Sequence, residues 1–406
     1  MSEKKGTPLV LIYVLMALTG AGYFVIAYKT GTLVLWGYKE DITLNNGMFP
    51  QIVNYAKDIY AVLWTAYLFL KENKTQEIQK DWFYLFFAIL LGIVLAFASG
   101  NGLLCIIGGI RAYLFAFITY RYCWKNEFVE SFWIKFLRVV ELMIVLQLVG
   151  VIIQAGLAGG GILLGSGAYR MMGLFTNAGT LGFFSLGAVI YLCYVFLNNK
   201  VSKIEFCFFS IISIFLALAS GSRGCVIYAV SVLVIALIEK SRLNRVSKFL
   251  ILPVIVIMVF IVIISNLTSY VGRGDLMESG VGRFKAWRDL LMLKPWQILI
   301  GTGLGAGTNS ARSLGASSIT MDSSFTVFIV QYGIWGLLIF IIQMIKVFRV
   351  IYRNSRYKWY SLVLIVIVFL ILFSGSLFEQ YTLIIPLIIV YCSLYKGEDI
   401  DNKDDE

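Results

Sequence analysis

The chain has 406 residues, of which 59% are hydrophobic and only 14% are charged. Soluble globular proteins carry about a quarter charged residues, so this composition excludes a soluble protein and predicts an integral membrane protein. The net charge of +11 does not indicate a nucleic-acid partner, because the Lys and Arg residues fall mainly in short segments between apolar runs, which is a topology signal.

Apolar runs of about twenty residues recur along the chain, and each can cross a bilayer as a helix. We predict an all-α polytopic fold, a single membrane domain over residues 1–406, with about twelve transmembrane helices. A cytoplasmic N-terminus puts most basic residues, and both termini, in the cytoplasm. The acidic tail 397–406 is expected to be disordered. The expected spans lie near 8–28, 50–70, 82–99, 103–120, 138–157, 179–197, 204–220, 224–238, 249–265, 325–345, 359–374 and 379–395.

The longest polar segment, residues 266–323, follows the ninth expected span and is predicted to be a large extracytoplasmic loop. It is unusually basic for an outward-facing loop. An anionic ligand would explain this. The alternative is that long loops follow the positive-inside rule only weakly. Residues 282–293 form a short amphipathic pattern, which is typical of a helix on a membrane surface or of a cap on the bundle. Its apolar face holds Phe284, Trp287, Leu290 and Leu291, and its polar side holds Arg283, Lys285, Arg288 and Asp289.

Two further outward arginines lie in short or glycine-rich connections. Arg170 is in the segment GSGAYRMMG before the sixth span, and Arg223 is in SGSRG between the seventh and eighth. The planar guanidinium binds phosphate oxygens bidentately and stays charged when partly buried. Convergence of these residues with Arg283 and Arg288 would create a diphosphate site; the alternative is that each side chain only reaches toward the interface.

Two carboxylates are candidates for a general base. Asp322 stands at the outer end of the tenth span, where it either caps that helix or acts on a substrate beside the arginines. Glu379, at another outer helix end, is the second candidate. Four charged residues fall within expected spans, where we expect them to pair with one another or to face a cavity; they are Lys57, Asp58, Arg111 and Glu141.

Several common site chemistries are excluded or disfavoured. The chain has no histidine, so histidine bases and histidine metal ligands are excluded. Its six cysteines show no CxxC spacing. The glycine-rich run 301–307 lacks the preceding strand of a dinucleotide site and predicts a tight turn with close backbone packing. We therefore expect neither a cofactor nor a metal.

Four motifs, taken in order, resemble the O-antigen polymerase and O-antigen ligase-like superfamily of bacterial membrane glycosyltransferases. They are YRMMGLFTNAGTLG at 169–182, SGSRG at 220–224, GRFKAWRDLL with IGTGLGAG within 282–307, and D-S-x9-G-x-x-G from Asp322 to Gly336. In ligases of this group the last motif usually begins with histidine. Here Asp322 takes that place, which weakens a ligase assignment and leaves the identity of the base open.

The resemblance implies a GT-C-like architecture and a substrate carried on undecaprenyl diphosphate at the outer face of a bacterial cytoplasmic membrane. The diphosphate would be bound by Arg170, Arg223, and Arg283 or Arg288, and the transfer would be inverting and metal-independent. A polymerase of O-antigen, capsule or exopolysaccharide repeat units is expected, with membrane lipids, a chain-length regulator and a flippase as partners. A ligase is the nearest alternative. A flippase or transporter is the alternative from another class, and it is disfavoured because the arginines gather in outer loops rather than at the midplane.

Overall fold

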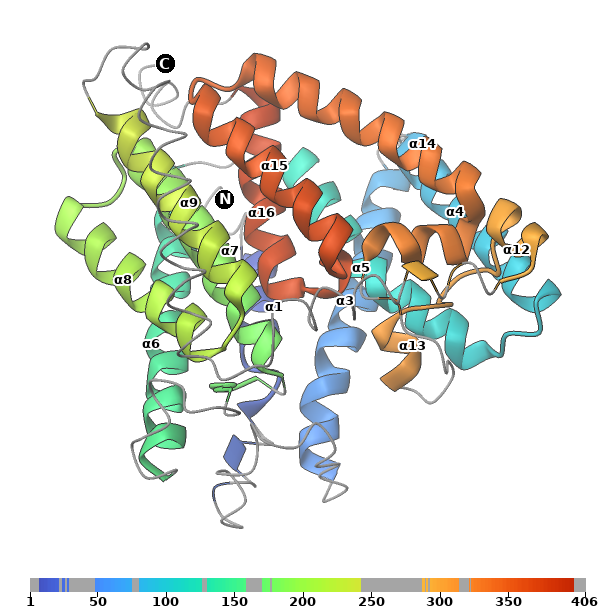
Figure 1. The fold of residues 1–406 in the computed structure, drawn as a ribbon, viewed down its shortest axis with the longest axis horizontal. Coiled ribbons are helices and arrows are strands. Elements are labelled where there is room, and N and C mark those ends of the chain that lie inside the picture. The colour runs from blue at the N-terminus through green and yellow to red at the C-terminus, as the bar shows by residue number, and fades with distance from the viewer. Residues whose placement is uncertain are drawn as a thin grey trace.

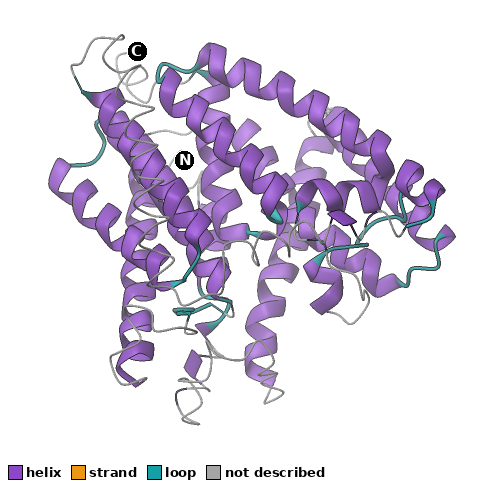
Figure 2. Ribbon diagram, in the orientation of Figure 1, coloured by secondary structure: helices purple, strands orange, loops and turns teal. Residues whose placement is uncertain are grey.

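The computed structural model describes residues 7–21, 24–25, 28, 48–74, 80–125, 130–157, 170–175, 177–241, 287–288, 290, 293–313, 321 and 323–397. Within these ranges the regular secondary structure is helical (Figure 2). The helices are α1 (Thr7–Ala17), α3 (Met48–Lys74), α4 (Lys80–Ala98), α5 (Leu103–Lys125), α6 (Glu130–Leu157), α7 (Ala178–Leu197), α8 (Lys203–Ala219), α9 (Arg223–Lys240), α12 (Pro295–Ile300), α13 (Asn309–Ser313), α14 (Ser324–Asn354), α15 (Lys358–Ser374), the 3₁₀ helix η3 (Leu377–Glu379) and α16 (Tyr381–Lys396).

The expected all-α membrane protein is confirmed in this coarse form. Four of the described helices are long and apolar enough to cross a membrane, and they lie within α5, α6, α7 and α14. A helix occupies each expected span that falls in the described ranges, although α1 covers only the first part of 8–28. The expected span 249–265, residues 266–286 of the loop and the tail from 398 onward lie outside the described residues.

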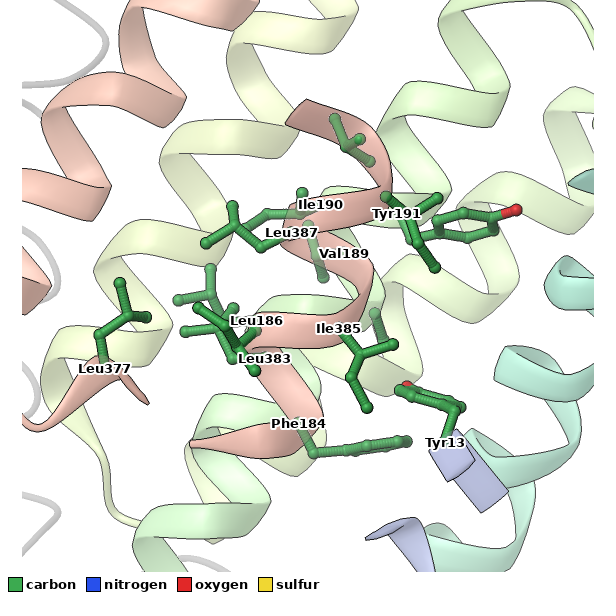
Figure 3. Packing of buried hydrophobic residues seen from close by; sticks show 14 of the residues in the cluster. Tyr13, Phe184, Leu186, Val189, Ile190, Tyr191, Leu377, Leu383, Ile385 and Leu387 are labelled. Atoms are coloured by element: carbon green, nitrogen blue, oxygen red, sulfur yellow. The ribbon is translucent and has the colours of Figure 1, made fainter. Parts of the chain in front are cut away.

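Helix α7 forms the centre of the bundle. In its apolar stretch 89% of the residues are buried, against 39–50% in the other three long apolar helices. Helix α7 packs against α8, α9 and α16 (Figure 1). Small residues permit this close packing: a Cβ on Gly187 would lie 2.8 Å from the Thr382 carbonyl oxygen of α16. Figure 3 shows apolar side chains of α7 and α16 meeting there, with Tyr13 of α1 against Phe184.

Buried tyrosines tie this core together through their hydroxyl groups. Tyr191 donates to the Trp133 carbonyl at 2.9 Å, and Tyr360 donates to the Ile190 carbonyl at 2.6 Å. An unpaired hydroxyl would be costly in an apolar core, so these bonds fix the helices beside one another as well as satisfying the polar groups.

The glycine-rich run 301–307 is the tight, closely packed turn that its composition predicts. Its four glycines all have positive φ, between 78° and 97°. A Cβ on Gly303 would lie 2.0 Å from the Ala96 amide nitrogen, and one on Gly305 would lie 1.7 Å from the Cys105 carbonyl oxygen. Only glycine allows the loop to pass this close to α4 and α5.

Helix α14 differs from the single span expected at 325–345. It extends to Asn354 and is broken at Gly333, where φ is 70° and ψ is −175°, a bend that is visible in Figure 1. The glycine-rich loop satisfies the backbone at the break, because the amides of Thr302 and Gly303 donate to the Val330 and Gln331 carbonyls at 2.7 and 3.0 Å. A single glycine is tolerated inside most helices, so the sequence pattern did not predict this break.

Candidate functional site

The segment 170–175 is fixed against the end of the bundle by backbone hydrogen bonds. The Met171 amide donates to the Ala219 carbonyl at 2.9 Å, at the end of α8. The amides of Met172 and Leu174 donate to side-chain oxygens of α6, namely Gln154 and Gln147, at 3.0 and 2.8 Å. Two buried glutamines of α6 therefore position a segment that the sequence pattern treats only as a loop.

Arg170 lies directly against the turn that carries Arg223. The Arg170 Nε donates to the Ser220 carbonyl at 2.8 Å, and its side chain passes over Gly221, which has a φ of 65°. This turn also packs on Gly182 of α7, where a Cβ would lie 2.7 Å from the Ser222 Cβ. The two arginine-bearing connections thus meet, although they are far apart in the sequence.

Arg223 begins α9 and is the most unusual polar group of this region. Its Nε and Nη2 atoms are buried and have no hydrogen-bond partner among the described residues. Unsatisfied buried donors are costly, and a guanidinium is most readily satisfied by a carboxylate or a phosphate. The described ion pairs do not include Arg223; they join Arg111 to Asp58, and Arg138 to both Glu141 and Glu205.

Arg288 lies at the same end of the bundle. The adjacent Trp287 stacks on Phe373 in the last turn of α15, with ring centroids 5.3 Å apart, and Leu290 is buried while Arg288 is exposed. Helix α15 packs beside α9, and its last turn and the first turn of α9 point to the same side, the lower one in Figure 1. The placement of Trp287 and Leu290 inward and Arg288 outward fits the expected amphipathic pattern.

The remaining predicted residues have different outcomes. Arg283 and Asp322 lie outside the described residues, so their predicted roles stay predictions. Glu379 accepts hydrogen bonds from the Ser310 amide on Oε1 at 2.7 Å and from the Asn309 amide and Nδ2 on Oε2 at 3.1 and 3.0 Å. Both of its carboxylate oxygens therefore hold the start of α13. A small cavity beside it is lined by Ala112, Tyr113, Thr308, Ser324, Val327, Ser376 and Phe378.

Two of the four charged residues within the expected spans pair with each other, as one of the two expected arrangements requires. Arg111 of α5 contacts Asp58 of α3, with the Arg111 Nε 3.2 Å from Asp58 Oδ1. Lys57 is 2% exposed beside them. Glu141 pairs instead with Arg138, one turn earlier on α6, at 2.8 Å. No group of three metal-ligating His, Cys, Asp or Glu side chains gathers within the described ranges.

The fold and these contacts define an all-helical membrane protein that holds two arginines together at one end of its helix bundle. No protein-family model matches the chain, and no curated protein matches it in sequence.

Proposed function

We propose that this protein is a bacterial polysaccharide polymerase. It joins oligosaccharide repeat units carried on undecaprenyl diphosphate, at the outer face of the cytoplasmic membrane, for O-antigen, capsule or exopolysaccharide. The observation that supports this most is that two buried nitrogens of Arg223 have no hydrogen-bond partner among the described residues, while Arg170 binds the turn that precedes Arg223. A lipid-linked diphosphate supplies the negative charge that such a site needs, and the apolar helices supply a surface for the lipid chain.

In the proposed reaction a sugar hydroxyl of the acceptor attacks the anomeric carbon of the donor sugar. The bond from that carbon to the diphosphate oxygen breaks, and the lipid diphosphate leaves with the electron pair. Arg170 and Arg223 stabilise the charge that develops on the leaving group, with Arg283 or Arg288 joining from the loop. Single displacement inverts the anomeric centre and needs one base on the acceptor side.

The proposal includes a GT-C-like architecture with about twelve spans and both termini in the cytoplasm. Repeat units must be brought to the outer face before they are joined, so a flippase is an expected partner, together with membrane lipids and a chain-length regulator. A ligase, which transfers a finished glycan to another acceptor, uses the same donor chemistry and is the nearest alternative.

The break in α14 favours a transporter or flippase as the second candidate. Transporters often bind substrates or ions at unwound backbone within broken helices. Here, however, the Val330 and Gln331 carbonyls already accept hydrogen bonds from the amides of Thr302 and Gly303. The carbonyls at the break are therefore engaged by the protein itself, and the arginine pair lies elsewhere, which favours the enzyme.

Purified protein in liposomes with fluorescent lipid-linked repeat units tests the proposal. We expect a ladder of extended chains without ATP and with divalent metals chelated. Arg223→Ala and Arg170→Ala should abolish the ladder, whereas Arg349→Ala, an exposed arginine late in α14, should not. Units that cross the membrane without extension would identify a flippase, and a single transfer to a different acceptor would identify a ligase.

A further inference from the structure

An ion pair between α3 and α5 holds a carboxylate in one orientation. Arg111 contacts Asp58 through one nitrogen, Nε, and on one oxygen, Oδ1, at 3.2 Å. The Asp58 Oδ2 has no hydrogen bond to any described residue, and the Asp58 side chain is 25% exposed. Arg111 therefore holds the carboxylate through Oδ1 and leaves Oδ2 without a described partner.

Asp58 differs in this respect from the other described candidate base. Glu379 uses both carboxylate oxygens to bind the first backbone amides of α13, and protonation of the carboxylate would weaken these charge-assisted bonds. A base must lie within hydrogen-bond reach of the proton that it removes, and it needs a free lone pair there. On geometry, Asp58 satisfies that condition better than Glu379.

A chain of contacts connects the Asp58–Arg111 pair to the last turn of α15, which lies beside α9. Tyr381, the first residue of α16, donates to the Arg111 carbonyl at 3.4 Å. The short connection through η3 joins that point to the last turn of α15, which packs beside α9 and points to the same side as Arg223. The first half of α5 also contacts the glycine-rich loop, since a Cβ on Gly109 would lie 2.3 Å from the Gly305 amide.

We propose that Asp58 is the general base of the transfer reaction and that Arg111 is its positioning residue. This inference rests on the proposed function. The oxygen of the acceptor sugar hydroxyl bonds to the anomeric carbon while Asp58 Oδ2 accepts the proton of that hydroxyl. The donor lipid diphosphate departs with the electrons of the broken bond.

Three variants separate a chemical role from a structural one. Asp58→Asn keeps the size and the hydrogen-bond acceptor but removes the base, and Asp58→Glu keeps the base. The double variant Asp58→Arg/Arg111→Asp keeps an ion pair between α3 and α5 but moves the carboxylate. Glu141→Gln is the matched control, because Glu141 is a buried carboxylate paired with Arg138 on α6, away from this site.

Each variant is measured in three ways: thermal unfolding, binding of labelled undecaprenyl diphosphate, and single-turnover transfer from lipid-linked repeat units. We expect Asp58→Asn to fold and to bind the lipid diphosphate as the wild type does, while transfer slows by about 100-fold or more, the contribution of a positioned general base. Asp58→Glu should retain part of the transfer rate, the double variant should fold without transferring, and Glu141→Gln should transfer normally.

Two results would overturn the assignment. Transfer by Asp58→Asn within about threefold of the wild-type rate would exclude a general base, whose loss costs at least about 100-fold. Restored transfer in the double variant would show that the pair serves only to join α3 and α5. If the wild type itself fails to extend repeat units, the proposed function is wrong and this inference fails with it. An active wild type with an active Asp58→Asn removes the inference alone.

Discussion

The partly buried Arg223 guanidinium predicts that a substitution which weakens anion binding also stabilises the free protein. Two of its nitrogens are buried without a partner in the described part of the chain, and each unsatisfied buried donor costs about 1–3 kcal/mol. The free protein therefore carries a penalty of about 2–6 kcal/mol, which a bound diphosphate would relieve. Arg223→Met keeps the length and the apolar stem of the side chain but removes the unsatisfied donors.

We expect Arg223→Met to unfold several degrees above the wild type, because each kcal/mol of the relieved penalty raises the midpoint by roughly 2–4 °C or less in a chain of this size. Undecaprenyl diphosphate at about 100 times its dissociation constant should stabilise the wild type by roughly 2.7 kcal/mol and the variant much less. Undecaprenol, which has the lipid chain without the phosphates, is the control ligand for a differential scanning measurement in detergent.

The opposite pattern would refute this reasoning. If Arg223→Met unfolds well below the wild type, and the wild type gains no stability from undecaprenyl diphosphate relative to undecaprenol, then Arg223 supports the fold and does not bind an anion.

Three further predictions concern the framework of the site. Gly305→Ala should lower the yield of folded protein and destabilise it by more than about 2 kcal/mol, because φ is 89° and the new Cβ would meet backbone; Gly102→Ala, with open space around it, should fold normally. Glu379→Gln should speed hydrogen exchange of the first amides of α13 by about 10–100-fold, since a charge-assisted bond contributes about 1.5–3 kcal/mol; unchanged exchange would show that Glu379 does not hold that helix. Trp287→Ala should lose the stack on Phe373, worth about 0.5–1.5 kcal/mol beyond the lost burial, and expose residues near 287–290 to protease while α5 to α9 stay resistant.

Much of the framework was predictable because it depends on local composition. Apolar runs indicate helices wherever the chain must satisfy its own backbone hydrogen bonds in an apolar medium, and the described helices occupy the expected positions. The glycines of 301–307 indicated a tight turn, which their positive φ angles confirm. The cost of isolated charges in the membrane predicted that charged residues within the spans pair or face a cavity, and Arg111 and Asp58 do pair.

The partners within each site were decided by the tertiary structure. The sequence suggested that Arg170 and Arg223 converge, but not that Arg170 donates to the Ser220 carbonyl while two nitrogens of Arg223 find no partner among the described residues. It placed Glu379 at a helix end without indicating that both of its oxygens bind the start of α13. A hydrogen bond between distant segments depends on how helices pack, and neighbouring residues carry little information about that packing.

The polar segment between the ninth and tenth expected spans also has some features that composition predicts and others that only the packing of the helices decides. Composition alone set it apart as the long polar interruption of a membrane protein, because hydropathy is a property of each residue. Only the packed structure shows that its glycine-rich part passes between α4, α5 and the break of α14, and that Trp287 attaches it to α15. Close approach of backbones is a property of pairs of segments, so it is decided when the helices come together.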